Sequence, residues 1–476
     1  MQLKLTMKKT LLFLLLAFQA ISQDVFVTKP YIQIGQKSSP NTLQVLWHAK
    51  PEHKNWSVEQ RAGDKMPWKK ADSLSYRFAN IKGIEPHQIV TAQLSGLPAG
   101  EKVNYRVMLD GKTVFSSVAQ APKSKSQDQH FVVVGDIGAE TVDQKKLALQ
   151  MHLAKPDFVA VPGDIVYENG LISEYKTKFW PIYNAEKADS LGAPLLRSVP
   201  FIAAVGNHDT DGRDLDSKPD GLAYYLYFSQ PHNGLKDKEG SAILPVLKGS
   251  EENKKAFLQA AGSNYPQMTN FSFDYGNAHW TVIDANTYMD WTDASILDWV
   301  AKDLENSKDA TWHFVMFHHP GFNSSREHFE QQHMRLLAPV FEKGGVDIVF
   351  NGHVHNYQRT YPMSFLPDRK GTLLIGGREN KLIRGRVVNG KWVLDKKFDG
   401  FRNSKAKGVL YVVTGAGGQE LYNPEQENDP DSWQKFTAKF ISTVHTLSVV
   451  DIQGKTLTLK QIDTEGKEVD SFHLTK

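Results

Sequence analysis

From residue 130 onward, short apolar runs alternate with segments that have a helical period. The runs are rich in Val, Ile and Phe, and they cover residues 131–134, 158–161, 201–205, 312–317, 346–350 and 409–413. Their nearly continuous apolar character predicts strands that are buried on both faces. Segments 141–155 and 326–343 fit helices between such strands. The pattern therefore predicts an α/β domain built in layers.

Two further segments are expected to add strands to this domain. Residues 271–285 contain a Gly-Asn turn and fit a hairpin. Residues 445–474 contain two glycine turns and fit terminal strands that extend the same domain rather than a separate unit. The predicted domain spans residues 130–476.

Residues 23–121 follow a different pattern, in which short segments alternate between apolar and polar positions. Segments 42–47 and 103–107 are examples, and turns rich in Pro, Gly and Lys separate such segments. Because no helical period is present, the region is predicted to be a small β-sandwich. The turn at 97–100 looks like the edge of a fibronectin type III domain. The polar, unpatterned residues 122–129 are expected to be a linker.

The N-terminus has the layout of a secretory signal peptide. Lys8 and Lys9 precede an apolar stretch at 10–18, and the small residues Ala20 and Ser22 stand at the positions that a cut before Gln23 requires. An ordinary apolar strand is the weaker interpretation, because it explains neither the lysine pair nor the small residues. The apolar stretch is too short to span a membrane. Residues 1–22 are therefore predicted to be removed, and the remaining protein to be soluble and secreted or periplasmic.

Composition narrows the possible chemistry. The chain has no cysteine, which excludes thiolate metal sites, cysteine nucleophiles and disulfides. The formal net charge is +3, and loss of the three lysines in residues 1–22 leaves 3 − 3 = 0. A neutral chain indicates neither a nucleic-acid partner nor a membrane-binding basic face.

Candidate metal ligands follow the apolar runs in five short loops. The loops carry carboxylates, imidazoles, one amide and one phenol, namely Asp136, Asp164 with Tyr167, Asn207, His318, and His353 with His355. In an α/β fold the carboxyl ends of the strands form the functional edge, so these groups are expected to converge. Such a set suits a hydrolytic site with two metals. A single Gly-Asp pair or two loop histidines would be unremarkable, but five such loops in order are not expected by chance.

Together and in this order, the residues resemble the calcineurin-like metallophosphoesterases, and within them the purple acid phosphatases. Most of the superfamily has a histidine two residues after the first aspartate, where this chain has Gly138. The purple enzymes lack it too and use a tyrosine three residues after the second aspartate, here Tyr167. The resemblance runs from about residue 24 to the end. It implies a two-layer β-sandwich core flanked by helices (α/β/β/α), preceded by a fibronectin III-like domain.

The resemblance also implies a division of ligands between two metal ions. Asp136, Tyr167 and His355 would hold the first ion, and the second would be held by Asn207, His318 and His353, with Asp164 bridging both. The phenolate set suits Fe(III), and the nitrogen-richer set suits Zn(II), Fe(II) or Mn(II). A bridging carboxylate would keep the ions about 3.5 to 4 Å apart.

The implied activity is that of an exported phosphatase that hydrolyses phosphomonoesters through in-line attack by a metal-bound hydroxide. His208 is expected to contact the phosphate and His328 to protonate the leaving group. Glu327 stands where plant members tend to have a second histidine, which leaves the pH optimum and the leaving-group preference open.

Two alternatives stay open. One is a phosphodiesterase or nucleotide hydrolase on the same metal site. The other is an extracellular binding module with a degenerate enzyme domain, although none of the seven expected ligands is substituted. The expected partner is a small phosphate ester, whose identity depends on the loops at 210–267 and 362–407.

Three other features receive structural interpretations. His319 is expected to lie behind the ligands, turned away from the metals. The aromatic residues at 224–228 are expected to pack in the core or to form a lid, and the glycines at 415–418 to form a tight turn near the rim of the site.

Overall fold

The N-terminal region is a β-sandwich of two four-stranded sheets. The computed structural model describes residues 25–236, 238–368 and 387–476, so the predicted signal peptide lies outside the described residues. One sheet has the order β1 (Phe26–Gln33), β2 (Leu43–Ala49), β6 (His87–Leu94) and β5 (Ser73–Ala79). The other has the order β4 (Lys69–Lys70), β3 (Trp56–Ala62), β7 (Lys102–Leu109) and β8 (Lys112–Gln120). The segments predicted from alternation at 42–47 and 103–107 lie in β2 and β7.

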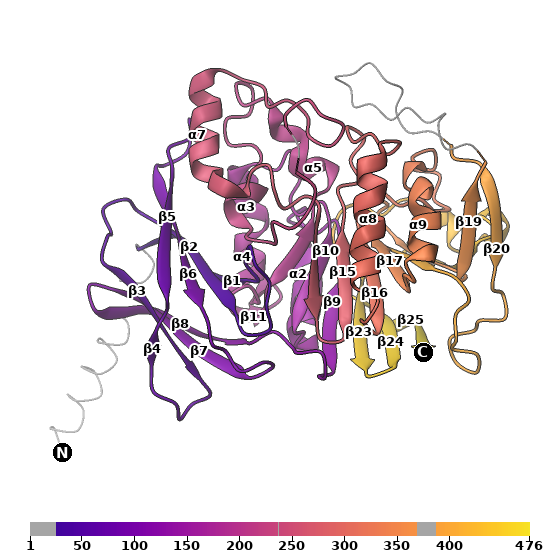
Figure 1. Ribbon diagram of the computed structural model, residues 1–476, viewed down its shortest axis with the longest axis horizontal. Coiled ribbons are helices and arrows are strands. Elements are labelled where there is room, and N and C mark those ends of the chain that lie inside the picture. Colours follow the sequence, from indigo (N-terminus) through magenta and orange to yellow (C-terminus); the bar gives the residue numbers. More distant parts are fainter. Residues whose placement is uncertain (1–24, 237, 369–386) are drawn as a thin grey trace.

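Two larger sheets face each other in the rest of the chain (Figure 1). The first has the order β13 (Phe201–Ala204), β10 (Phe158–Pro162), β9 (Gln129–Val133), β23 (Thr446–Gln453), β24 (Thr456–Asp463) and β25 (Glu468–Thr475). The second has the order β14 (Phe271–Tyr275), β15 (Ala278–Val282), β16 (Trp312–Met316), β17 (Ile348–Asn351), β21 (Leu410–Thr414), β18 (Tyr357–Thr360) and β22 (Thr437–Ile441). All six apolar runs are strands, as predicted.

Alternation within each strand builds three apolar layers. On β9, Phe131 and Val133 face the second sheet and pack with residues such as Trp280, whereas Val132 points to the opposite core. That outer core is closed by α2 (Val142–Ala154), α3 (Ile172–Lys178) and α4 (Trp180–Tyr183). The other outer core is closed by α8 (Ala294–Asn306) and α9 (Ala338–Lys343), which lie in front of β15–β17 in Figure 1. The predicted α/β/β/α fold is confirmed.

The C-terminal strands complete the first sheet. β23 pairs antiparallel with β9, whereas β9, β10 and β13 are parallel to one another. The predicted hairpin at 271–285 is also present, because β14 and β15 pair across a turn at Gly276, which has φ 57°. The helix predicted at 141–155 is α2, with Thr141 as its N-cap and Lys155 in the left-handed conformation at its end. The helical period and the glycine turns thus placed these elements correctly.

One predicted helix is wrong. The segment 326–343 contains only a 3₁₀ turn, η3 (His333–Leu337), followed by α9, and residues 326–332 are irregular. Within the irregular part, the Arg326 N–H donates to Gln426 Oε1 and the Glu327 N–H to Asn423 Oδ1. These distant side chains satisfy the backbone donors and hold the start of the segment in an irregular loop. The loop also places His328 at φ 57°, which no helix permits.

The remaining helices lie mostly on the long connection after β13. They are α5 (Asn207–Thr210), α6 (Tyr224–Tyr227) and α7 (Glu251–Ala261), with the 3₁₀ turns η1 (Asp211–Arg213) and η2 (Gly262–Asn264). Two 3₁₀ turns precede β22, namely η5 (Pro424–Gln426) and η6 (Pro430–Ser432). Two small two-stranded sheets complete the described structure: β11 (Asn184–Asp189) pairs with β12 (Gly192–Pro194), and β19 (Met363–Pro367) pairs with β20 (Gly390–Leu394). The aromatic residues of α6 are buried, as predicted.

A partly buried arginine ties the β-sandwich to the larger domain. Arg77 on β5 donates to the backbone carbonyls of Tyr225, Leu226, Ala260 and Ala261, on and beside α6 and α7. Because the guanidinium donors point in fixed directions, four carbonyl acceptors around it fix how the β5 strand lies against α6 and α7.

Among the described residues, no helix is long and apolar enough to cross a membrane.

Candidate metal centre

The five predicted ligand loops meet at one edge of the two central sheets. Asp136 follows β9, Asp164 and Tyr167 follow β10, and Asn207 follows β13. From the second sheet, His318 follows β16, and His353 and His355 follow β17. β9, β10 and β13 run parallel in one sheet, and β16 and β17 run parallel in the other. Their carboxyl ends therefore share an edge, and the structure brings all seven side chains together.

Asp136, Tyr167 and His355 form the first half of the cluster. The Tyr167 hydroxyl lies 2.8 Å from Asp136 Oδ1 and 3.2 Å from His355 Nε2. His355 Nε2 lies 3.5 Å from Asp136 Oδ1. All three side chains are buried. A phenol, a carboxylate and an imidazole thus point at one small volume.

Asp164, His318 and His353 form the second half, with Asn207 beside them. His318 Nε2 lies 3.1 Å from Asp164 Oδ2 and 3.2 Å from His353 Nδ1. One ligand atom from each of these three residues falls within a span of 4.8 Å, which suits a bound cation. The Asn207 Oδ1 atom is buried and has no hydrogen-bond partner. A buried amide oxygen without a donor is costly, so a cation at this position would satisfy it.

The histidine ring nitrogens are oriented for metal binding. His318 Nδ1 lies 2.8 Å from the Pro162 carbonyl, and His355 Nδ1 lies 2.8 Å from the Glu420 carbonyl. Because a carbonyl only accepts, each Nδ1 must carry a proton, so the neutral ring has its free lone pair on Nε2 and can offer it to a cation. Metal-binding histidines usually donate their other nitrogen in this way. The donor set around Asp164, His318 and His353 therefore fits a bound metal ion.

Glycines let these loops approach one another. A Cβ atom at Gly138 would stand 2.1 Å from the Ile165 carbonyl oxygen, and the Gly138 carbonyl accepts from the Tyr167 N–H at 3.1 Å. A histidine at position 138 is therefore excluded by the packing that presents Tyr167. A Cβ at Gly206 would stand 2.0 Å from Asp164 Oδ1, so any side chain at position 206 would collide with this predicted ligand. The tight approach of Gly138 to the Tyr167 loop thus accounts for the absence of a histidine at position 138 in a chain that carries Tyr167.

Charges within the cluster compensate for burial. Burial acts to raise the pKa of Asp164, but His318 and His208 beside it lower that pKa below its ordinary value. Burial acts to lower the pKa of His318, and Asp164 and Asp136 outweigh it and raise the value to about 9. Burial and the two aspartates raise the pKa of Tyr167. The aspartates thus favour positive charge at the cluster, whether it is a proton on His318 or a bound cation.

The two histidines predicted to handle phosphate lie next to the cluster. The His208 ring is 4.5 Å from the Tyr167 ring, its Nδ1 is 2.7 Å from the Glu168 carbonyl, and its Nε2 is 3.9 Å from Asp164 Oδ2. The His328 ring lies against the His353 ring in a tilted arrangement, with ring centroids 4.0 Å apart. Both rings are thus close enough to the cluster to reach a group bound there.

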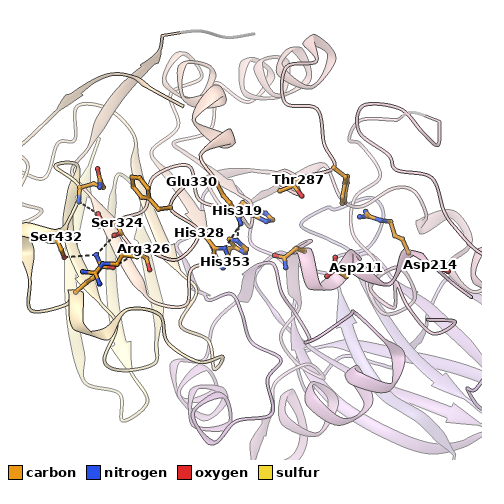
Figure 2. Close-up of a pocket in the computed structure, with 18 of the residues that line it drawn as sticks. Asp211, Asp214, Thr287, His319, Ser324, Arg326, His328, Glu330, His353 and Ser432 are labelled. Atoms are coloured by element: carbon orange, nitrogen blue, oxygen red, sulfur yellow. Dashed lines mark hydrogen bonds between the residues drawn. The ribbon is translucent and has the colours of Figure 1, made fainter. Parts of the chain in front are cut away.

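A cavity of about 1150 Å³ opens over this part of the cluster. Figure 2 shows His319, His328 and His353 at its centre, with Arg326 and Ser432 on one side and Asp211 and Asp214 on the other. The sequence predicts that His319 turns away, but it lines this cavity, and its ring contacts the His353 ring with centroids 4.1 Å apart. The wall is polar and of mixed charge, which suits a small polar ligand.

Two residues in contact with the cluster were missed by the sequence analysis. The Tyr422 ring stacks on His355 with centroids 4.1 Å apart, and the Gln331 side chain contacts both His353 and His328. Gln331 lies late in the loop after β16 and Tyr422 late in the loop after β21, several residues beyond the strand ends where ligands were expected, so no signal in the sequence marked them. The predicted turn at 415–418 does lie beside the site, because a Cβ at Gly415 would meet Asp136 Oδ2 at 2.8 Å.

Comparison with known proteins agrees with this geometry. The calcineurin-like phosphoesterase family profile matches residues 129–357, the stretch that contains all seven clustered side chains. Residues 129–357 form a calcineurin-like phosphoesterase domain.

Solved structures agree on the fold. A purple acid phosphatase from yellow lupin seeds superposes with a TM-score of 0.63 at 16% identity, over 94% of this chain and 74% of that one. PhoD superposes with a TM-score of 0.56 at 12% identity, over 95% of this chain and 91% of that one.

Relatives found by sequence are also named purple acid phosphatases. Purple acid phosphatase 1 of Ipomoea batatas is 26% identical over 61% of this chain and 55% of its own length. A protein named probable inactive purple acid phosphatase 27, from Arabidopsis thaliana, is 26% identical over 66% of this chain and 53% of its own length. The chain thus spans about half the length of these curated relatives. The resemblance to purple acid phosphatases is confirmed, and the relatives include proteins described as inactive.

Proposed function

We propose that the protein is an exported phosphatase that uses two metal ions to hydrolyse phosphomonoesters. The observation that supports this most strongly is the convergence of seven hard or borderline ligands on one edge, with the Asn207 amide oxygen buried and unpaired. A degenerate enzyme used only for binding would not need to retain that arrangement. The substrate is a small phosphate ester that enters the cavity above the cluster.

Each residue of the cluster has a role in holding the ions. Asp136, Tyr167 and His355 would hold one ion, and Asn207, His318 and His353 the other, with Asp164 shared. The phenol favours Fe(III) at the first position, and the second suits Zn(II), Fe(II) or Mn(II). When bound, the pair supplies Lewis acidity that neutralises phosphate oxygens and lowers the pKa of water.

The surrounding histidines act on the substrate itself. His208 donates its Nδ1 proton to the Glu168 carbonyl, so its Nε2 faces the cluster and is placed to contact the phosphate. His328 lines the cavity and is placed to give a proton to the departing alkoxide, which is otherwise a poor leaving group. The cluster therefore holds the phosphate between the metal ligands and a proton donor.

Export is part of the proposal and rests on residues 1–22. Their charged, apolar and small-residue order supports cleavage before Gln23, and the domain limits 23–121 and 130–476 remain those predicted from the pattern. Mass spectrometry of the protein recovered outside the cytoplasm should show an N-terminus at Gln23. Retention of the whole protein in the cytoplasm with an intact N-terminus would contradict export.

Elemental analysis combined with a panel of phosphate esters tests the activity. We expect about two metal ions per chain, including iron, and hydrolysis of nitrophenyl phosphate and alkyl phosphates. Asp164→Asn should lower the content of both metals and abolish turnover. Faster hydrolysis of bis-nitrophenyl phosphate than of nitrophenyl phosphate would favour a phosphodiesterase. Full metal content without hydrolysis of any ester would favour a binding protein instead.

A further inference from the structure

The Gln331 side chain lies between two of the site histidines. Its Oε1 is 2.8 Å from His353 Nε2, and its Nε2 is 3.1 Å from His328 Nδ1. The Gln331 backbone N–H donates to the His328 carbonyl at 3.0 Å, so the two residues belong to one tight turn. The two rings are also in contact, tilted by 39° with their centroids 4.0 Å apart. One amide thus joins a predicted metal ligand to the predicted proton donor.

An amide has a direction, and this direction determines the protonation of both rings. The Gln331 oxygen only accepts, so His353 Nε2 must carry a proton and its Nδ1 keeps a free lone pair. Nδ1 is the atom that faces His318 Nε2 at 3.2 Å, inside the cluster. The Gln331 nitrogen only donates, so His328 Nδ1 must accept and the proton of neutral His328 must lie on Nε2.

The opposite orientation of the amide would be incompatible with metal binding. It would present the Gln331 nitrogen to His353 Nε2, which would then have to accept and would move the proton to Nδ1. His318 and His355 avoid this problem because backbone carbonyls, which cannot turn around, hold their Nδ1 protons. Of the three clustered imidazoles, His353 has a side chain as its acceptor. A metal ion on His353 Nδ1 therefore requires the Gln331 amide orientation that also directs its N–H to His328 Nδ1.

We propose that Gln331 is a positioning residue that couples the metal site to the proton donor, since it holds Nδ1 of His353 free for a cation and keeps the proton of His328 on Nε2. The proposal rests on the proposed function in one respect, namely that His353 binds metal through Nδ1. Glutamine is required for both tasks. A glutamate would keep the acceptor for His353 but would offer no donor to His328.

Two substitutions separate the two hydrogen bonds. Gln331→Glu keeps the contact to His353 and replaces the donor to His328 with an acceptor. Gln331→Met has a similar length and makes neither contact. Gln419→Glu is the matched control for added charge, because the Gln419 amide oxygen accepts from the adjacent Glu420 N–H. Zinc-loaded protein is used throughout, since zinc is diamagnetic and permits NMR.

Long-range ¹H–¹⁵N spectra of histidine-labelled protein at about pH 8, above the ordinary histidine pKa of roughly 6.5, report which ring nitrogen is protonated. The His328 signals are identified by their loss in His328→Asn. We expect the proton on Nε2 in the wild type and in Gln419→Glu. In Gln331→Glu, Nδ1 should become protonated, because it then faces a carboxylate. An unprotonated Nδ1 in Gln331→Glu would overturn the proposal.

Zinc affinity provides the second readout. Loss of the acceptor that orients a ligand histidine weakens metal binding by about 10- to 100-fold, so Gln331→Met should show this loss. Gln331→Glu and Gln419→Glu should stay within about threefold of the wild type, because they retain that acceptor. Unchanged affinity in Gln331→Met would also overturn the proposal. If the wild type hydrolyses no ester, the proposed activity fails, while these two measurements still decide the role of Gln331.

Discussion

Replacing Asn207 with alanine should stabilise the metal-free protein and weaken the metal-loaded one. The Asn207 oxygen is buried without a partner, and no hydrogen bond of its side chain is present among the described residues. In the metal-free protein the amide therefore has a desolvation cost and no compensating contact. When metal binds, the same oxygen becomes a ligand, so the sign of its contribution reverses.

The size of the effect follows from burial. An unsatisfied buried polar group costs about 1–3 kcal/mol, and Asn207 is only partly buried as a residue and lines the open cavity. We therefore expect Asn207→Ala to raise the free energy of unfolding of the metal-free protein by about 1 kcal/mol. Loss of a ligand should lower zinc affinity at least about 10-fold, which removes about 1.4 kcal/mol or more of the stabilisation that saturating zinc provides.

Urea unfolding of the chelated and the zinc-loaded protein measures both effects. Asn264→Ala is the control, because that buried amide donates to the Tyr225 and Phe228 carbonyls at 2.9 Å each. It should destabilise both forms alike. If Asn207→Ala destabilised the metal-free protein as much as Asn264→Ala does, the oxygen would not be unsatisfied and the ligand argument would fail.

Three further changes test the site and its surroundings. Tyr167→Phe should bleach the visible tyrosinate-to-iron band of the iron-loaded protein, and an iron-replete but colourless wild type would contradict a phenolate ligand. His328→Ala should slow alkyl phosphates by about 10²-fold and nitrophenyl phosphate much less, whereas equal losses would assign the acid role elsewhere. Burial acts to lower the pKa of His279, but Asp274 at 2.8 Å and Asp303 at 3.0 Å raise it to about 9. Because the folded-state pKa is raised, the stabilisation is complete below the unfolded-state pKa of about 6.5 and is lost as the pH rises to about 9. Urea unfolding should show a loss of about 3 kcal/mol over this range, and His279→Gln should lack this dependence.

Much of the fold and of the candidate site could be predicted because the signals are local. A strand buried on both faces must be apolar along its length, so the runs at 131–134 and 312–317 appear as strands in any α/β context. The Thr141 cap and the Gly-Asn turn of the hairpin also act within a few residues. Ligand loops follow such strands directly, so the clustering of Asp136 and His318 could be predicted from their positions alone.

Tertiary structure alone decided the features that depend on distant atoms. The stretch 326–332 has a helical pattern, yet Asn423 and Gln426, about a hundred residues away, hydrogen-bond its backbone and hold it irregular. That irregular loop places Gln331 between His353 and His328, a contact for which the sequence carries no periodic signal. Hydrogen-bond direction depends on which atoms meet in space. The sequence therefore determined which groups reach the site, and the folded chain determined which nitrogen of each ring faces it.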